Sequence, residues 1–230
     1  MAPQVDYCQH VLLPLVREMG VDATLTISRR GYFPCGGGEV VLETRPLHEK
    51  LRPVYQKEAG TLVRVGGVAF VSSKLPLKVA QNMARAAEAE LRRVISKGTE
   101  VSIDVVAEPP TRGEGAGCGI VLYAQTSTGC RFGGSALGER GVSAATVGKN
   151  AAVELLTTIK AGATVDSYLL DQLIIFMALA VRSGEGTDSA APDARPESTL
   201  RPSRPCFSFY VGGNLACDVP RNDLACRDGH

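Results

Sequence analysis

Three polar side chains near the end of the apolar part of the sequence have the types and spacing of a small binding site. Tyr168, Asp171 and Gln172 occupy positions i, i+3 and i+4 within the stretch DSYLLDQL. In a helix these positions share one side. A tyrosine beside an acid and an amide can stack on a nucleobase and hydrogen-bond with it. The spacing alone nevertheless favours ordinary polar groups on the surface of a capped helix.

Two glycine-rich stretches lack the residues of known phosphate-binding motifs. PCGGGEV has no Lys-Ser/Thr pair to close a P-loop. GEGAGCG has the wrong spacing for a dinucleotide fingerprint and leads into a strand instead of a helix. We therefore expect the glycines of PCGGGEV to serve backbone geometry between two strands.

The histidines and cysteines show no metal-ligand spacing. His10, His48 and His230 lie far apart, and the seven cysteines include no CxxC pair. The pattern predicts free thiols and neither a zinc site nor a disulfide framework.

The overall charge gives no strong preference for nucleic acid, because the 230 residues carry a formal net charge of +1. The net charge does not exclude a local basic face. One predicted helix carries four basic side chains, Arg85, Arg92, Arg93 and Lys97. These side chains could contact RNA phosphates, but the glutamates between them favour a solvated face.

Composition predicts a globular protein without a membrane span. Hydrophobic residues make up 44% of the chain, an ordinary fraction, and no apolar run is long enough to cross a bilayer. The opening stretch MAPQVDYCQH lacks the pattern of a signal peptide, so we expect a reducing compartment.

The first part of the chain predicts one helix and two strands. Apolar spacing indicates a helix over 4–19, with a kink at Pro14 and Gly20 just after its end. Alternation indicates a strand over 21–28, and a second strand over 39–45 suggests an antiparallel pair with a wide connection. A polar stretch over 47–60 marks a domain junction near its end.

The middle part predicts the order β-α-β-β-β-α, a small α+β domain. Strands are expected over 61–71, 100–107, 120–127 and 130–138, the last two as a hairpin. A helix over 76–97 has Pro76 at its first position and an apolar stripe of Leu77, Ala80, Ala84, Ala87, Leu91 and Val94. Another helix is expected over 143–161, with Ser143 as N-cap.

The last part changes character near residue 181. A helix capped by Asp166 or Ser167 is expected to run to about Ala180. From residue 182 to 205 the only large apolar residue is Leu200. We therefore expect most of 182–230 to be disordered or loosely attached, because it buries too little to offset its ordering entropy.

Four long, collinear stretches together resemble the RNA 3'-terminal phosphate cyclases of the eukaryotic kind: MAPQVDY, RRGYFPCGGGEV, TSTGCRFGGSALGERGVSAATVG and TVDSYLLDQLIIFMALA. The resemblance runs from Met1 to about Ala180. A sister family of cyclase-like ribosome-biogenesis proteins shares the fold, but the Tyr-x-x-Asp-Gln pattern at Tyr168 favours the true cyclases.

The resemblance implies an α+β protein whose large domain is built of repeated units like the C-terminal domain of translation initiation factor three. A smaller α+β insert domain interrupts that large domain. The implied division is 1–56 for part of the large domain, 57–162 for the insert domain, 163–181 for the return helix and 182–230 for a divergent tail.

The resemblance also implies a reaction and a place for it. Family members are ligases of RNA processing that use ATP and a divalent cation, Mg or Mn, to turn an RNA 3'-phosphate into a 2',3'-cyclic phosphate. A histidine is adenylylated, AMP passes to the RNA 3'-phosphate, and the neighbouring 2'-hydroxyl displaces it, which is covalent nucleophilic catalysis. RNA 3' ends are the implied partner, and the nucleus is the implied location.

Carried over residue by residue, the resemblance assigns part of a nucleotide site. Pro3 and Tyr168 match positions that pack on the adenine, and Asp171 and Gln172 match polar positions of the same site. Tyr7 and Phe132 are weaker matches, since either could belong to the core.

The sequence departs from the family pattern at both ends, and no residue is assigned as catalytic. The family places glycine-, arginine- and glutamine-containing motifs before MAPQVDY and its catalytic histidine after the DQLIIFMALA helix. None of the three histidines here matches that position. We therefore predict a truncated form that is inactive alone. Two alternatives stay open: a non-catalytic module that binds RNA or a protein partner, and an unstable chain whose uncovered apolar faces favour aggregation.

Overall fold

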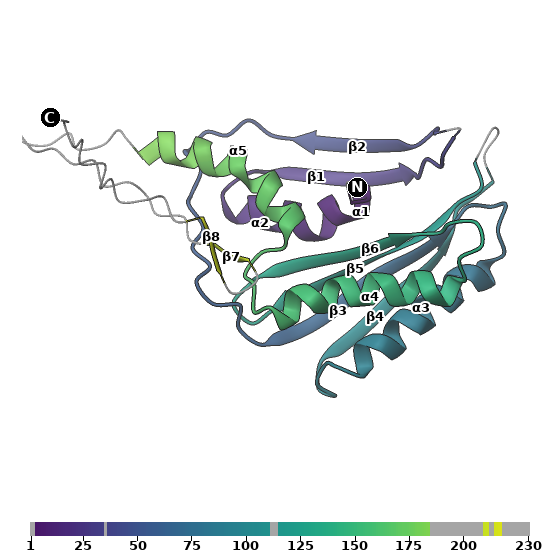
Figure 1. Cartoon of the computed structure of the whole chain (residues 1–230). Helices are drawn as coiled ribbons and strands as arrows, with labels where there is room; N and C mark the ends of the chain where they lie inside the picture. Colours follow the sequence, from purple (N-terminus) through teal and green to yellow (C-terminus); the bar gives the residue numbers. More distant parts are fainter. Residues whose placement is uncertain (1–2, 35, 111–114, 185–208, 212–213, 218–230) are drawn as a thin grey trace, which may run out of the picture.

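The computed structural model describes residues 3–34, 36–110, 115–184, 209–211 and 214–217 (Figure 1). Its elements, in chain order, are α1 (Val5–Tyr7), η1 (Cys8–Leu12), α2 (Leu13–Glu18), β1 (Ala23–Arg29), β2 (Glu39–Thr44), β3 (Leu62–Val71), α3 (Leu77–Arg92), β4 (Glu100–Ala107), β5 (Cys118–Thr126), β6 (Arg131–Leu137), α4 (Ala144–Lys160), α5 (Ser167–Gly184), β7 (Phe209–Val211) and β8 (Asn214–Cys217). Helices and mixed sheets occur together, so the fold class is α+β, as predicted.

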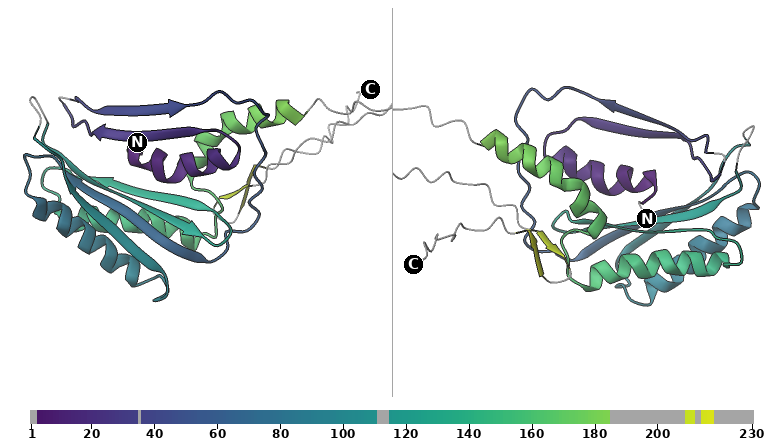
Figure 2. Two further views of the ribbon diagram at one scale, coloured as in Figure 1. Left: turned by 180° about the vertical axis from the view of Figure 1, so that it is seen from behind. Right: turned by 45° about the horizontal axis from the view of Figure 1, so that its top comes forward.

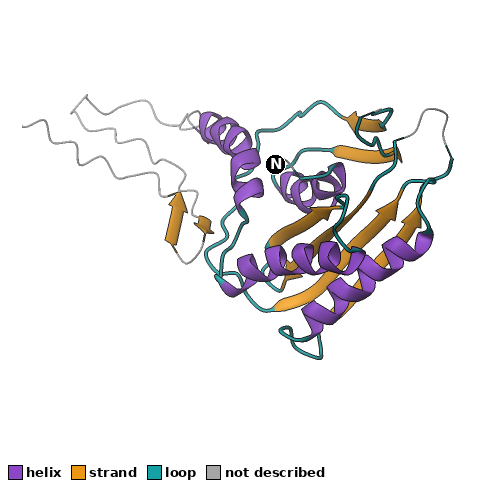
Figure 3. Cartoon of the chain, turned by 45° about the vertical axis from the view of Figure 1, so that its right-hand side comes forward, coloured by secondary structure: helices purple, strands orange, loops and turns teal. Residues whose placement is uncertain are grey.

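The central sheet has four strands in the order β4-β3-β5-β6. β3 and β4 are parallel and are joined through α3, whereas β3–β5 and β5–β6 are antiparallel. The predicted order β-α-β-β-β-α and the predicted hairpin are therefore present. α3 and α4 lie together over one face of this sheet (Figure 3).

The core under α3 and α4 follows the predicted spacing, except at the ends of α3. Ala80, Ala84, Ala87 and Leu91 are buried against the sheet, but Leu77 and Val94 are exposed. The expected span of 76–97 was too long, because the helix ends at Arg92 and turns follow it. The backbone N–H groups of Val94 and Ile95 both donate to the Leu91 carbonyl, which closes the end of the helix. Pro76 is the N-cap, one position before the predicted one.

The opposite face of the sheet is covered by α1, η1 and α2, which together form the N-terminal helix. This helix lies between the β1–β2 hairpin and the four strands (Figure 2). Tyr7 and Val11 are buried there in one cluster with Phe70 and Val121 of the sheet. Gly133 permits this close approach, since a Cβ at that position would lie 2.3 Å from Cε2 of Tyr7.

The N-terminal helix is irregular at the place where Pro14 predicted a kink. Pro14 has no N–H to donate to a carbonyl four residues earlier, and its ring crowds that carbonyl. The chain forms a π-helical turn at Cys8–Leu12, in which the N–H of Leu13 donates to the carbonyl of Cys8. Gly20 follows the helix with a φ of 104°, a conformation that glycine adopts at little cost.

The β1–β2 pair is antiparallel, as expected, and leaves apolar side chains uncovered. All six residues of β2 are exposed, among them Val40, Val41 and Leu42. In the described part of the chain, β2 pairs only with β1. Ile174, Ile175 and Leu179 of α5 are exposed as well. The exposed apolar faces that the sequence led us to expect are therefore present.

The C-terminal part is described only in pieces. α5 extends to Gly184, beyond the predicted end near Ala180. The disorder predicted for 182–230 falls mostly outside the described residues; within that range β7 and β8 form a short antiparallel pair. The four domain limits expected from the resemblance stay predictions. No helix among the described residues is both long and apolar enough to cross a membrane.

Candidate functional site

The first two turns of α5 carry three of the predicted site residues on one side. Tyr168 and Gln172 are half-buried, and Asp171 is exposed. The Oε1 atom of Gln172 is buried and has no hydrogen-bond partner among the described residues. A buried acceptor without a partner is costly and calls for an explanation such as a bound ligand or a water molecule.

The start of α5 is held by Asp166, one of the two predicted capping residues. Its Oδ1 atom accepts a hydrogen bond of 2.8 Å from the N–H of Leu169. This is the contact that an N-cap side chain makes with the third residue of a helix. Ser167, the other predicted cap, is exposed inside the first turn.

Asp166 also joins α5 to two other parts of the chain. The Tyr7 hydroxyl donates to Oδ1 at 2.6 Å, and the N–H of Gly133 in β6 donates to Oδ2 at 2.8 Å. Burial raises the pKa of Tyr7, and the negative charge of Asp166 raises it further. The hydroxyl of Tyr7 therefore stays protonated and donates. The spacing within DSYLLDQL gives no sign of either contact.

Tyr168 lies among groups from α1 and α4. Its ring meets the Tyr7 ring edge-on, with the centroids 6.1 Å apart and the planes at 75°. The charge of Glu154 on α4, followed by partial burial, raises the pKa of Tyr168. Glu154 itself accepts a hydrogen bond of 2.7 Å from the N–H of Ser135 in β6. The predicted stacking residue thus lies close to Tyr7 of α1 and Glu154 of α4.

The remaining predicted residues divide between the helix start and the core. Pro3 is half-buried and precedes α1, one helical turn before Tyr7. Next to it, the Oε1 atom of Gln4 is buried without a hydrogen-bond partner among the described residues. Tyr7 and Phe132 are both 1% exposed, which favours a core role over a place in a pocket.

The glycine-rich stretches serve backbone geometry and close packing. Gly36 and Gly37 have φ angles of 65° and 75°, in the left-handed region. Gly117 packs on Tyr32, and a Cβ at Gly117 would lie 2.3 Å from Cδ1 of that ring. The structural interpretation of PCGGGEV is therefore confirmed.

Two of the four basic residues predicted on the basic face of α3 form ion pairs with glutamates of α3. Arg92 lies 3.6 Å from Glu88, and Arg93 lies 2.9 Å from Glu90. Arg92 also donates to the carbonyl of Thr99. These contacts favour the solvated-face interpretation.

Two of the three histidines lie in the described part of the chain. His10 stacks on Tyr123 with a centroid distance of 4.3 Å, and His48 lies in the exposed linker after β2. His230 lies outside the described residues. Where the chain is described, no three His, Cys, Asp or Glu side chains gather closely enough to hold a metal ion. Cys8, Cys118 and Cys130 are free thiols.

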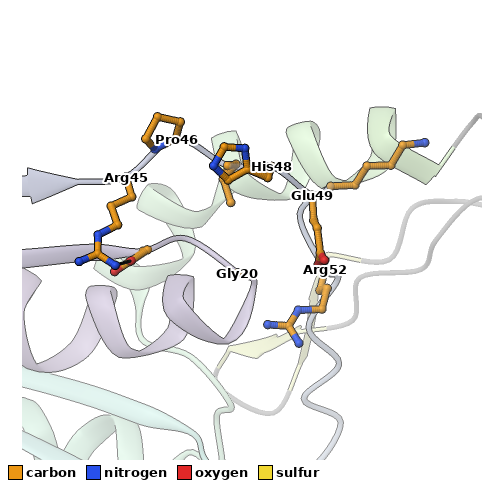
Figure 4. Close-up of a pocket in the computed structure, with 9 residues that line it drawn as sticks. Gly20, Arg45, Pro46, His48, Glu49 and Arg52 are labelled. Atoms are coloured by element: carbon orange, nitrogen blue, oxygen red, sulfur yellow. Dashed lines mark ion pairs between the residues drawn. The ribbon is translucent and has the colours of Figure 1, made fainter.

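A cavity of about 480 Å³ lies away from α5, in the linker after β2 (Figure 4). Arg45 pairs with Asp22 at 3.4 Å on one side of this cavity. Arg52 extends below Gly20, so the two guanidinium groups do not converge (Figure 4). The cavity is lined by both signs of charge, with three basic and two acidic side chains.

The structure is thus an α+β fold with a four-stranded sheet and two helices between its N-terminal elements and α5. The family model of the RNA 3'-terminal phosphate cyclase insert domain matches residues 57–160. The chain belongs to the RNA 3'-terminal phosphate cyclase family.

Relatives from distant organisms support this assignment. The chain is 40% identical over 181 residues to the RNA 3'-terminal phosphate cyclase of Staphylothermus marinus. The matched region makes up 78% of this chain and 50% of the relative. The chain is 40% identical over 179 residues to the cyclase of Thermococcus kodakarensis, with 78% and 50% covered. It is 37% identical over 180 residues to a probable cyclase of Dictyostelium discoideum, with 78% and 41% covered. The chain thus spans about half the length, or less, of these relatives.

Proposed function

We propose that this chain supplies the adenine-binding helix of an ATP-dependent RNA 3'-terminal phosphate cyclase. The observation that carries the proposal is the side of α5 formed by Tyr168, Asp171 and Gln172, where the buried Oε1 atom of Gln172 has no partner among the described residues. The relatives named RNA 3'-terminal phosphate cyclase support RNA 3' ends as the substrate.

The chemistry of these side chains suits an adenine nucleotide. A base can stack on the Tyr168 ring. By the family resemblance, Pro3 would pack on the opposite face of the same base. An amide oxygen such as Oε1 of Gln172 accepts a hydrogen bond from an exocyclic amino group, which adenine has and guanine lacks at the same position. The exposed Asp171 can accept hydrogen bonds from ribose hydroxyls.

The described residues do not fit a divalent cation. They contain no group of three ligating side chains. We therefore assign the cation to none of the described residues; it would accompany the ATP phosphates, whose charge it offsets.

Binding is tested by titrating the full chain with ATP and with GTP in the presence of magnesium. We expect ATP to bind more tightly, and Asp171→Ala and Gln172→Ala each to weaken ATP binding about tenfold, the loss of one hydrogen bond to a ligand. Ser167→Ala is the matched control, since Ser167 is exposed in the same turn. Equal binding of ATP and GTP by the wild-type chain would overturn the proposal.

We also propose that the isolated chain does not complete the reaction. The family mechanism needs a histidine near the α-phosphate, but the described histidines are His10, stacked on Tyr123, and His48, in the linker. Intact mass after incubation with ATP and magnesium should show no AMP adduct, and a 3'-phosphorylated oligonucleotide should not be cyclised. An adduct would show that another residue replaces the family histidine.

The non-catalytic alternative, binding of RNA through α3, predicts salt-sensitive binding that weakens in Arg92→Ala and Arg93→Ala. The ion pairs of both residues with neighbouring glutamates make this the weaker proposal. The nuclear location implied by the resemblance is part of the main proposal and is tested by imaging a tagged chain.

A further inference from the structure

Asp166 occupies a junction of three elements that are far apart in sequence. Its side chain is buried, with the residue 4% exposed. It accepts hydrogen bonds from the Tyr7 hydroxyl at the end of α1, from the Gly133 N–H in β6 and from the Leu169 N–H in α5. One carboxylate therefore fixes the start of α5 against both the N-terminal helix and the middle-domain sheet.

Only a carboxylate fits this set of partners. Oδ1 receives two of the three donors and Oδ2 receives the third, so both oxygens must act as acceptors. An asparagine would place an NH₂ group against a donor at one of these positions. The negative charge is also favourable at the N-terminus of a helix, where N–H groups point outward.

The proposed nucleotide residues follow Asp166 within the next two turns of the same helix. Their orientation depends on the direction and rotation of α5 at its start, because the side chains of a rigid helix move together with the helix. The Tyr7 ring also contacts Tyr168 edge-on. A binding group is effective when supporting side chains hold it in place.

We propose that Asp166 is a positioning residue for the nucleotide, through which the insert domain and the N-terminal helix set the orientation of Tyr168, Asp171 and Gln172. This inference rests on the proposed function. It gives the insert domain a part in nucleotide binding without any direct contact with the ligand.

The first measurement is amide hydrogen exchange of the full chain without nucleotide, comparing the wild type with Asp166→Asn and with the milder Tyr7→Phe. We expect loss of protection in the first two turns of α5 and around Gly133, while α3 keeps its protection. Unchanged protection of α5 in Asp166→Asn would overturn the inference.

The second measurement is the ratio of ATP to GTP affinity, which does not depend on the fraction of folded chain. We expect this ratio to fall at least tenfold in Asp166→Asn and less in Tyr7→Phe, because misplaced groups no longer discriminate between the bases. Ser143→Ala is the matched control: it removes the N-cap of α4 and so lowers stability elsewhere, and the ratio should stay at the wild-type value.

The outcomes separate the two proposals. No ATP preference in the wild-type chain would overturn the proposed function, and the inference with it. A wild-type preference that Asp166→Asn retains in full would overturn the inference alone. An equal loss in Ser143→Ala would show that the loss of discrimination is not specific to the Asp166 junction and would also overturn the positioning role.

Discussion

The hydroxyl of Tyr7 donates a hydrogen bond of 2.6 Å to Asp166, and the two residues are 159 positions apart in the sequence. This contact joins the beginning of the described chain to the start of its last long helix. Both side chains are almost fully buried, so the hydrogen bond is formed without competition from solvent.

Replacement of Tyr7 by phenylalanine should lower the free energy of unfolding by about 1–3 kcal/mol, because it removes one donor from a buried carboxylate while the ring still packs on Gly133. Urea denaturation measures the change. Ser167→Ala is the control, since Ser167 is exposed and surface changes usually stay within about 0.5 kcal/mol. Equal stability of Tyr7→Phe and the wild type would contradict the importance of this contact.

Arg30 bridges two buried carboxylates, from Asp6 and Glu108. Its guanidinium donates to Asp6 at 2.5 and 3.2 Å and also to Glu108. Burial opposes its charge, but the two carboxylates outweigh this effect and raise the pKa of Arg30. The arrangement connects the N-terminal helix to the end of β4.

Arg30→Met should therefore destabilise the chain by about 3–5 kcal/mol, since both carboxylates would stay buried without their partner. Arg45→Met removes an exposed ion pair with Asp22 and should cost less than about 1 kcal/mol. Denaturation curves of the two variants at neutral pH make the comparison. A similar small cost for both would show that water or another group replaces Arg30.

His10 makes the stability depend on pH. It stacks on Tyr123, and burial is the main cause that lowers its pKa below the usual value. The unfolded chain therefore takes up this proton first as the pH falls. The contribution of neutral His10 should be fully present above about pH 6.5 and should be lost progressively below it.

His10→Phe keeps a ring against Tyr123 and removes the titrating group, so its stability should fall less than that of the wild type between about pH 7 and 5. The other charged groups around His10 are present in both proteins and cancel in the difference: Asp6, Arg30, Asp104 and Arg131. Parallel pH profiles from urea denaturation would exclude His10 as the source.

The outer side of α5 should govern association and not stability. Ile175 is 62% exposed, so Ile175→Lys should leave the free energy of unfolding nearly unchanged and should reduce self-association in light scattering. Leu173 is 1% exposed, so Leu173→Ala should cost about 2–5 kcal/mol. Unchanged scattering of Ile175→Lys would mean that the exposed apolar face does not drive association.

Local patterns predicted most elements, because each pattern depends on residues close in sequence. The alternation of Leu25 and Ile27 indicated a strand, and Ser143 marked the start of α4 by its capping hydroxyl. The end of α3 was placed too late, since Val94 continues the apolar spacing although no partner in the described part of the chain buries it. Periodicity cannot show where such a partner is missing.

For the site, the sequence by itself determined that Tyr168, Asp171 and Gln172 share a helix side, because helical geometry relates residues three and four apart. Only the tertiary structure decided that Asp166 meets Tyr7 and Gly133, and that Arg30 meets Asp6 and Glu108. These contacts join residues whose separation in sequence carries no geometric information. The Asp166 contacts form only when the N-terminal helix and α5 pack on the same face of the sheet.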